Sequence, residues 1–153
     1  MKQVYTDQDQ SNIEQLAESI AGAIPRGAMI ELVGDVGAGK TTFTRALARG
    51  MGISSTINSP TFTIENRYEI QDGRMLLHYD FYRLGDAGIM QDELAEALSD
   101  ETNIVVIEWA GIVDDILPKD RLQIQFEATG ENTRKVTLLS GGENSDKLLG
   151  ALV

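Results

Sequence analysis

The spacing of apolar residues predicts an amphipathic helix near the start of the chain. Within residues 11–24, one face of a helix would carry Ile13, Leu16, Ala17, Ile20 and Ile24. Ser11 followed by Glu14 is typical of a capping box, in which each residue's side chain satisfies a free backbone N–H of the other. Pro25 and Gly27 then end the predicted helix, because proline cannot continue the hydrogen-bond pattern and glycine favours turns.

Further apolar or alternating runs predict a sheet and two more helices. The predicted strands span residues 29–33, 61–70, 75–79, 104–107, 121–127 and 133–139, and the last two form a hairpin around Gly130. The predicted helices span residues 42–50 and 92–98. Residues 140–153 are expected to be a loosely packed tail that is rich in turns up to residue 146 and ends in a short helix. Strands interspersed with helices indicate an α/β protein, in which a mixed sheet is flanked by helices.

The composition fits one domain that spans residues 1–153. A chain of 153 residues with 42% apolar residues suits a single hydrophobic core. The sequence contains no cysteine, which excludes disulfides, thiolate metal sites and cysteine nucleophiles. Its single histidine, His78, excludes a histidine-rich metal site. We interpret His78 as a packed strand residue rather than a catalytic base.

The formal net charge of −11 narrows the range of partners. An acidic surface repels nucleic-acid phosphates, so we expect no extensive direct contact with DNA or RNA, although the same charge also promotes solubility. No apolar run approaches the roughly 20 residues that cross a bilayer, and the polar first residues lack the apolar core of a signal peptide. We therefore expect a cytoplasmic protein without membrane contact.

One motif carries most of the functional information. Residues 34–41 read Gly-Asp-Val-Gly-Ala-Gly-Lys-Thr and match G-x-x-x-x-G-K-[ST], the phosphate-binding P-loop. The predicted strand before it and the predicted helix after it are the context that this motif requires. The backbone N–H groups of such a loop form an anion-binding nest, and the helix adds the positive end of its dipole. Lys40 is predicted to reach the β- and γ-phosphates and Thr41 to bind Mg²⁺, whereas an ordinary glycine-rich turn is the alternative.

A P-loop enzyme also needs an acidic residue at the end of a strand to help hold Mg²⁺. Asp80 follows the strand predicted over 75–79, and Glu108 follows the strand predicted over 104–107. The carboxyl ends of parallel strands lie at the edge of the sheet where a P-loop also lies. The residues leave open which of the two contacts the metal, and exposed carboxylates are the alternative for both. The predicted catalytic residues are Lys40, Thr41, Asp80 and Glu108, and the predicted metal ligands are Thr41, Asp80 and Glu108.

Four motifs follow one another along the chain and indicate a family. They are GDVGAGKTTF at 34–43, SPTFT at 59–63, HYDFYRL at 78–84 and IEW at 107–109, followed by Leu117 and Pro118. Together they resemble the TsaE family (also called YjeE), the small bacterial P-loop ATPases of tRNA threonylcarbamoyladenosine synthesis. The resemblance covers residues 29–139, and this combination of motifs is much more specific than the P-loop alone.

The resemblance implies an ATPase that uses ATP and Mg²⁺, is weakly active alone and works with a TsaB–TsaD-type complex. In that family TsaD carries out the transfer on tRNA, so this chain would contact tRNA only through its partners. The resemblance places Asp80 and Glu108 at magnesium positions, residues 59–63 in a nucleotide-sensing loop and Trp109 beside the nucleotide. By residue type alone, residues 59–61 indicate a capped turn and Trp109 indicates buried packing. The expected nucleotide contacts are Asp35, Val36, Gly37, Ala38, Gly39, Lys40, Thr41, Thr42 and Trp109.

Other P-loop functions stay open on the sequence. A small-molecule kinase usually closes an arginine-rich lid over the phosphates, and here Arg67, Arg74 and Arg83 are scattered. A GTP-driven switch would carry an Asn-Lys-x-Asp segment, and residues 117–120 read Leu-Pro-Lys-Asp instead. A structural protein with an inert P-loop is the last alternative.

Overall fold

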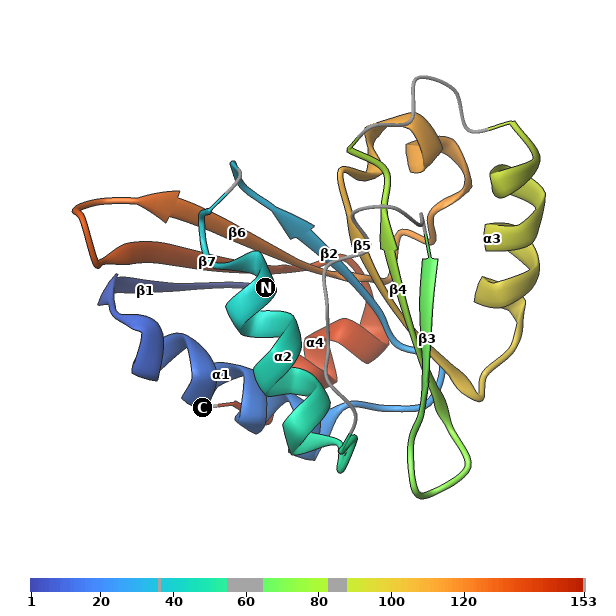
Figure 1. The fold of residues 1–153 in the computed structure, drawn as a ribbon, viewed down its shortest axis with the longest axis horizontal. Helices are drawn as coiled ribbons and strands as arrows, with labels where there is room; N and C mark the ends of the chain where they lie inside the picture. Colours follow the sequence, from blue (N-terminus) through green and yellow to red (C-terminus); the bar gives the residue numbers. More distant parts are fainter. Residues whose placement is uncertain (36, 55–64, 83–87, 153) are drawn as a thin grey trace.

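The computed structural model describes residues 1–35, 37–54, 65–82 and 88–152. Figure 1 shows strands and helices interspersed along this part of the chain. The strands are β1 (Lys2–Gln8), β2 (Met29–Val33), β3 (Glu65–Glu69), β4 (Met75–Asp80), β5 (Asn103–Glu108), β6 (Leu122–Ala128) and β7 (Arg134–Ser140). The helices are α1 (Gln10–Ala23), α2 (Lys40–Gly50), α3 (Ile89–Ser99) and α4 (Glu143–Gly150), with a 3₁₀ helix η1 over Ala110–Ile116.

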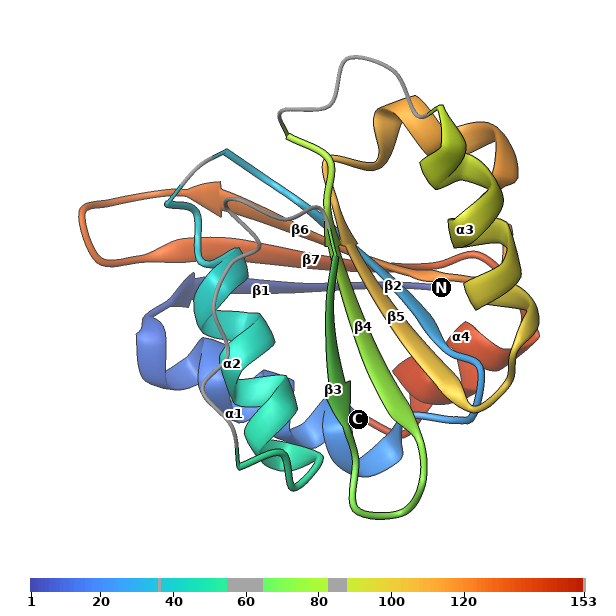
Figure 2. The ribbon, with the colours of Figure 1, turned by 45° about the vertical axis from the view of Figure 1, so that its right-hand side comes forward.

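All of these strands join one mixed sheet in the order β1-β7-β6-β2-β5-β4-β3. The central strands β6, β2, β5 and β4 are parallel, whereas β3 and the pair β7 and β1 run antiparallel to their neighbours (Figure 2). Parallel strands end at the same edge of a sheet, so the carboxyl ends of β2, β5 and β4 lie side by side. The predicted α/β architecture with a mixed sheet is confirmed.

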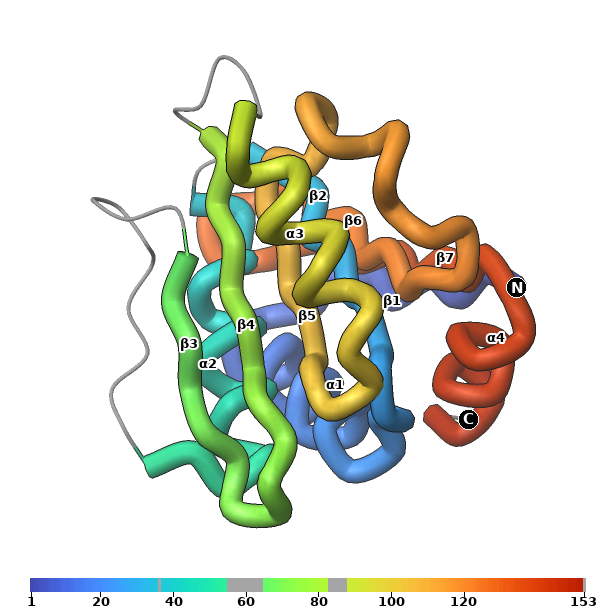
Figure 3. Tube along the Cα trace, turned by 90° about the vertical axis from the view of Figure 1, so that its right-hand side faces the viewer, coloured from blue at the N-terminus to red at the C-terminus, as the bar shows by residue number. Residues whose placement is uncertain are grey.

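Helices cover both faces of the sheet, as Figure 3 shows with α3 on the side opposite to α1 and α2. Strands β2, β4 and β5 are therefore buried on both sides, which explains their nearly continuous apolar sequences, whereas β6 alternates buried apolar residues with half-buried polar ones. Ile30 and Leu32 of β2 pack in the cluster beneath α1 and α2, while Met29 packs in the cluster beneath α3. Within the described ranges, no helix has the length and apolar character of a membrane span.

The first helix confirms the predicted amphipathic pattern but begins earlier than expected. The predicted capping box of Ser11 and Glu14 is wrong. Asp9 is the N-cap, and its Oδ1 accepts a hydrogen bond from the backbone N–H of Asn12 at 2.8 Å. In return, Asn12 Oδ1 accepts from the N–H of Asp9 at 3.0 Å. Ser11 lies inside the first turn, where it cannot cap the helix.

The two ends of the chain are more ordered than the sequence suggested. Strand β1 was not predicted, because its mostly polar residues lack a clear apolar alternation, yet it pairs with β7 along the edge of the sheet. The expected loose tail contains α4, whose Leu148 and Leu149 are buried in the core beneath α1 and α2. The Asp120 carboxylate stabilises the start of α4, because it accepts from the backbone N–H groups of Asn144 and Ser145, each at 2.9 Å.

The close approach of α1 and α2 predicts opposite effects for two glycine substitutions. A Cβ on Gly50 would lie 2.6 Å from Ala21 Cβ and 3.3 Å from Glu18 Cα, so we expect Gly50→Ala to lower the free energy of unfolding by about 1–3 kcal/mol. Gly22 in α1 has open space around its Cβ position, so Gly22→Ala should stabilise the protein by roughly 0.5–1 kcal/mol. Urea unfolding of both variants measures the difference. Stabilisation by both would contradict this packing of α1 on α2.

Candidate functional site

A cleft of about 960 Å³ opens where β2 and β5 end, and β6 forms its other wall. The P-loop forms one side of this cleft and the start of η1 forms the opposite side. The lining residues are Glu31, Leu32, Val33, Gly34, Asp35, Gly37, Ala38, Lys40, Trp109, Ala110, Gly111, Gln125, Phe126, Glu127, Ala128 and Arg134. A cleft of this size, with apolar walls and a few convergent polar groups, is typical of a small-molecule site.

Three glycines of the P-loop, Gly34, Gly37 and Gly39, have positive φ values, which side chains disfavour. Gly34 has φ 155°, and a Cβ there would lie 2.8 Å from the Phe126 carbonyl oxygen. Gly39, the residue before α2, has φ 114°, which is in the region that side chains disfavour. The Ala38 N–H donates to the Asp35 carbonyl at 3.0 Å, so a local turn shapes the loop. These constraints place the loop amides at the start of α2, where the helix dipole favours an anion.

Arg134, the first residue of β7, braces the same loop from outside. Its Nε donates to the Ala38 carbonyl at 3.2 Å, and its Nη2 donates to the Gly37 carbonyl at 3.2 Å. These two hydrogen bonds tie the P-loop to the start of β7. Arg134 was not predicted from the sequence, because its position at the start of a hairpin strand gives no indication of a contact with the P-loop, nearly 100 residues away.

Lys40 is buried and already surrounded by electron-rich groups. Its Nζ donates to the Gly34 carbonyl at 2.6 Å, lies 3.8 Å from Glu108 Oε1 and sits 4.3 Å from the centroid of the Trp109 ring. Only 5% of Lys40 is exposed. A buried ammonium is costly unless it is paired, and here a carbonyl, a carboxylate and an aromatic face share its charge. The structure therefore brings together Lys40, Glu108 and Trp109, three of the predicted site residues.

Glu108 is the centre of a buried polar cluster at the end of β5. Its Oε2 lies 2.6 Å from His78 Nε2, while its Oε1 faces Lys40. Glu108 is 3% exposed and His78 is 1% exposed, so water does not screen these contacts. The two strands bring His78 and Glu108 together because β4 and β5 are parallel neighbours.

Asp80 ends β4 directly beside Glu108 in the register of the two strands. Its Oδ1 accepts from the Tyr82 N–H at 3.0 Å. Burial raises the pKa of Asp80 above its ordinary value, and the nearby negative charge of Glu108 raises the pKa further, against the opposing effects of the Tyr82 N–H and Lys40. The folded protein thus holds the charged form of Asp80 at a cost, which a nearby cation would relieve.

The other predicted ligands lie close to this cluster but outside the cleft wall. Thr41 and Thr42 are half-buried in the first turn of α2. In the described part of the chain, no three His, Asp or Glu side chains are arranged to hold a metal by themselves. A Mg²⁺ ion here would thus depend on ligand oxygens and water besides the protein, which is how Mg²⁺ usually binds with phosphates. Thr41, Asp80 and Glu108 fit that partial set.

Trp109 takes an unusual backbone conformation that turns its ring toward the P-loop. Its φ of 57° is in the left-handed region, which a bulky residue rarely adopts. The ring stacks at a tilt on Tyr82, with 4.8 Å between centroids, and its face covers the Lys40 ammonium. Strain of this kind is common at functional sites. Trp109 therefore lies in the cleft, beside the predicted phosphate-binding loop.

Glu31 in β2 is a further buried carboxylate in the cleft that the sequence analysis missed. Its Oε2 accepts from Gln123 Nε2 at 2.7 Å and lies 3.7 Å from Arg121 Nε. Gln123 Oε1 in turn accepts from Gln125 Nε2 at 2.7 Å. Glu31 was missed because it lies inside an apolar run, where a charged residue gives no periodic signal.

Three parts of the predicted site lie outside the described residues. They are Val36, residues 59–63 and Arg83.

Comparisons with known proteins agree on one family. The family model for threonylcarbamoyl adenosine biosynthesis protein TsaE matches residues 7–136. The tRNA threonylcarbamoyladenosine biosynthesis protein TsaE of Bacillus subtilis is 38% identical over 87% of this chain and 82% of its own length. The protein of the same name from Streptomyces coelicolor is 36% identical over 86% of this chain and 92% of its own length. The crystal structure of YdiB from Bacillus subtilis superposes with a TM-score of 0.82 at 30% identity, covering 99% of this chain and 94% of YdiB.

The raised pKa of Asp80 predicts that a neutral replacement stabilises the protein. Ionisation of Asp80 lowers the free energy of unfolding as the pH rises from its ordinary pKa of 3.8 through the raised value, because the folded state binds the proton more tightly. Asp80→Asn keeps an acceptor for the Tyr82 N–H and removes the charge. We therefore expect a higher Tm than that of the wild type at pH 7, with a difference that shrinks as the pH approaches 4.

Asp100 provides the matched control for this titration. Hydrogen bonds from the Thr102 N–H and hydroxyl lower the pKa of Asp100, so its charged form stabilises the fold above its ordinary pKa. Asp100→Asn should lower the Tm at pH 7 or leave it unchanged. Thermal unfolding of both variants between pH 4.5 and 7 separates the two signs, and a Tm of Asp80→Asn below the wild-type value at pH 7 would refute the assignment.

Proposed function

This chain belongs to the TsaE family, and we propose that it is the ATP-binding and ATP-hydrolysing component of a machinery that makes tRNA threonylcarbamoyladenosine, acting with a TsaB–TsaD-type complex. The observation that carries this proposal is the buried meeting of the P-loop lysine Lys40 with Glu108 and Trp109 at the end of the central strands. The names of the relatives support the part of the proposal that concerns tRNA modification. The P-loop motif supports the part that concerns nucleotide binding.

The cleft supports the binding of a nucleoside triphosphate at the P-loop. The N–H groups of the loop and of the first turn of α2 form an anion-binding concavity, and Arg134 fixes the loop by its carbonyl oxygens. Lys40 would exchange its contact with the Gly34 carbonyl for the β- and γ-phosphates. In this exchange, a charged phosphate oxygen replaces the neutral Gly34 carbonyl oxygen as an acceptor for the buried ammonium. Such a charge-assisted hydrogen bond is favourable in a site shielded from water.

The acidic residues support a magnesium site next to the phosphates. When bound, Mg²⁺ would neutralise the negative charge of the phosphoryl oxygens that grows during transfer. Thr41, Asp80 and Glu108 would hold the ion together with nucleotide oxygens and water. Asp80 carries an ionisation cost in the folded protein, and a neighbouring dication would offset that cost. Glu108 would be released from Lys40 when the ammonium moves to the phosphates.

The arrangement of charges supports a division of labour with partner proteins. Of the arginines that the structure describes near the cleft, Arg134 is engaged by the P-loop carbonyls and Arg121 by Glu31 and Asp114. Neither is free to stabilise a transferring phosphoryl group, so a partner would supply that charge. The net charge of −11 disfavours direct binding of tRNA, which the partner complex would hold instead. Such a role belongs in the cytoplasm.

The first test addresses the P-loop itself. We expect Lys40→Ala to weaken ATP binding by at least tenfold, because a charge-assisted contact to a phosphate is worth roughly 1.5–3 kcal/mol. Isothermal titration calorimetry with MgATP measures the affinity, and thermal unfolding verifies that the variant is folded. Lys147→Ala is the control, since Lys147 is an exposed lysine that pairs only with Glu143 of its own helix among the described contacts. Equal ATP affinity of the two variants would reject the P-loop assignment.

The second test addresses the partners. We expect slow ATP hydrolysis by the chain alone and faster hydrolysis after addition of a TsaB–TsaD-type complex, because a catalytic group supplied in trans can raise the rate by roughly 10³–10⁵. The same mixture should sustain threonylcarbamoylation of tRNA over many turnovers only when this chain and ATP are present. Fast hydrolysis without partners, together with no effect on tRNA modification, would favour a kinase or another P-loop function over the one proposed.

A further inference from the structure

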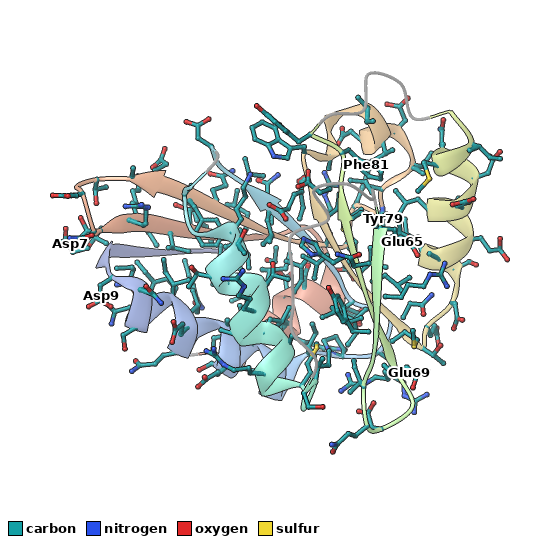
Figure 4. The ribbon with its side chains drawn as sticks, viewed as in Figure 1. Asp7, Asp9, Glu65, Glu69, Tyr79 and Phe81 are labelled. Carbon is teal, nitrogen blue, oxygen red and sulfur yellow. The ribbon has the colours of Figure 1, made fainter. Side chains whose placement is uncertain are left out.

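His78 is the single histidine of the chain, and it is buried in β4, next to the edge strand β3 of the sheet. Side chains alternate between the two faces of a strand, so the neighbours of His78 along β4 point the other way. Figure 4 labels Tyr79, the next residue of β4, and Phe81, which follows the strand; their rings pack 5.8 Å apart in the cluster beneath α3. His78 and Asp80 share the opposite face, toward α2 and its P-loop.

The protonation of the His78 ring follows from its surroundings. Nε2 lies 2.6 Å from Glu108 Oε2, and a carboxylate can only accept, so Nε2 carries the proton. Nδ1 is buried without a hydrogen-bond partner among the described residues. Unprotonated Nδ1 leaves only a buried lone pair without a partner. A protonated Nδ1 would leave a buried N–H donor without an acceptor, which is more costly. The structure therefore favours the tautomer with the proton on Nε2.

We propose that His78 is a positioning residue that fixes the Glu108 carboxylate for ATP hydrolysis. Its hydrogen bond holds Oε2, so that Oε1 faces Lys40. This inference rests on the function proposed above and assigns the orientation of Glu108 to a residue that touches neither nucleotide nor metal. It differs from simple packing, because an apolar side chain of the same size would fill the space and leave Glu108 free to rotate.

The need for this contact is greatest when nucleotide is bound. In this structure, Lys40 and His78 both hold Glu108, one at each oxygen. If bound phosphates draw the Lys40 ammonium away, the hydrogen bond from His78 is the remaining polar contact of the buried Glu108 side chain among the described residues. Partners of this kind, which orient a carboxylate near a metal, typically change activity by roughly 10–100-fold when they are removed.

Three substitutions separate positioning from packing. His78→Gln carries an amide N–H at about the reach of imidazole Nε2, so it should retain kcat to within about fivefold. His78→Leu fills the same space without a donor, and His78→Asn places its amide nearer the strand, at about the reach of Nδ1. We expect both to lose roughly 10–100-fold in kcat, with KM for ATP changed by less than about threefold, because the hydrogen bond acts after binding. ATPase assays with the TsaB–TsaD-type complex measure both constants.

A second readout does not depend on activity. Because the chain has one histidine, ¹⁵N NMR of the labelled protein reports a single imidazole, and the coupling pattern shows which nitrogen carries the proton. We expect a protonated Nε2 in the wild type, and in Glu108→Gln we expect a changed Nε2 signal.

Several results would overturn the inference. These are an unprotonated Nε2 in the wild type, full kcat in folded His78→Leu, or a loss in His78→Gln as large as that in His78→Leu. Thermal unfolding establishes that each variant is folded before its kcat is compared. A wild-type chain that hydrolyses no ATP with its partners would instead overturn the proposed function, whatever the NMR result.

Discussion

The buried charge of Lys40 constrains the rest of the site. An ammonium that is 5% exposed must keep acceptors around it, and the fold supplies them from two segments: the Gly34 carbonyl of the P-loop, and Glu108 with the Trp109 ring at the end of β5. Removing one member of such a buried pair typically costs about 3–5 kcal/mol, because the other charge stays behind without a partner. The parallel pairing of β2 with β5 satisfies this requirement, since it brings the P-loop and Glu108 to the same edge of the sheet. Local geometry and global topology therefore depend on each other.

Much of the fold was predictable because its signals are local. Strand β2 was predicted at its observed bounds, since an apolar run between turn residues defines a buried strand. The hairpin of β6 and β7 was predicted for the same reason. The start of α4 was not predictable from its own residues, because its first turn is capped by Asp120, more than 20 residues upstream. The polar strand β1 was missed because its pairing with β7, rather than its own pattern, keeps it in the sheet.

The residues of the candidate site also fall into those that were predicted from local sequence signals and those that were not. Lys40 and Trp109 were found from motifs, and the structure brings them together with Glu108 as expected. Their roles toward nucleotide and metal remain proposals. Arg134 and Glu31 were not predicted, because each makes contacts that exist only in the folded chain. Arg134 donates to carbonyl oxygens of the P-loop, and Glu31 accepts from a residue of the neighbouring strand. A sequence motif thus identifies the groups that would meet a ligand, whereas the groups that hold them in place emerge from the topology.

The packing of the Trp109 indole on Lys40 makes the tryptophan fluorescence of the protein sensitive to the position of this lysine. Trp109 is the chain's single tryptophan, and its ring centroid lies 4.3 Å from the ammonium that phosphates would attract. The energy of an excited indole depends strongly on nearby charge, so any displacement of Lys40 shifts the colour and intensity of the emitted light. Because the chain has no second tryptophan, the emission of the unlabelled protein would report any such displacement of Lys40.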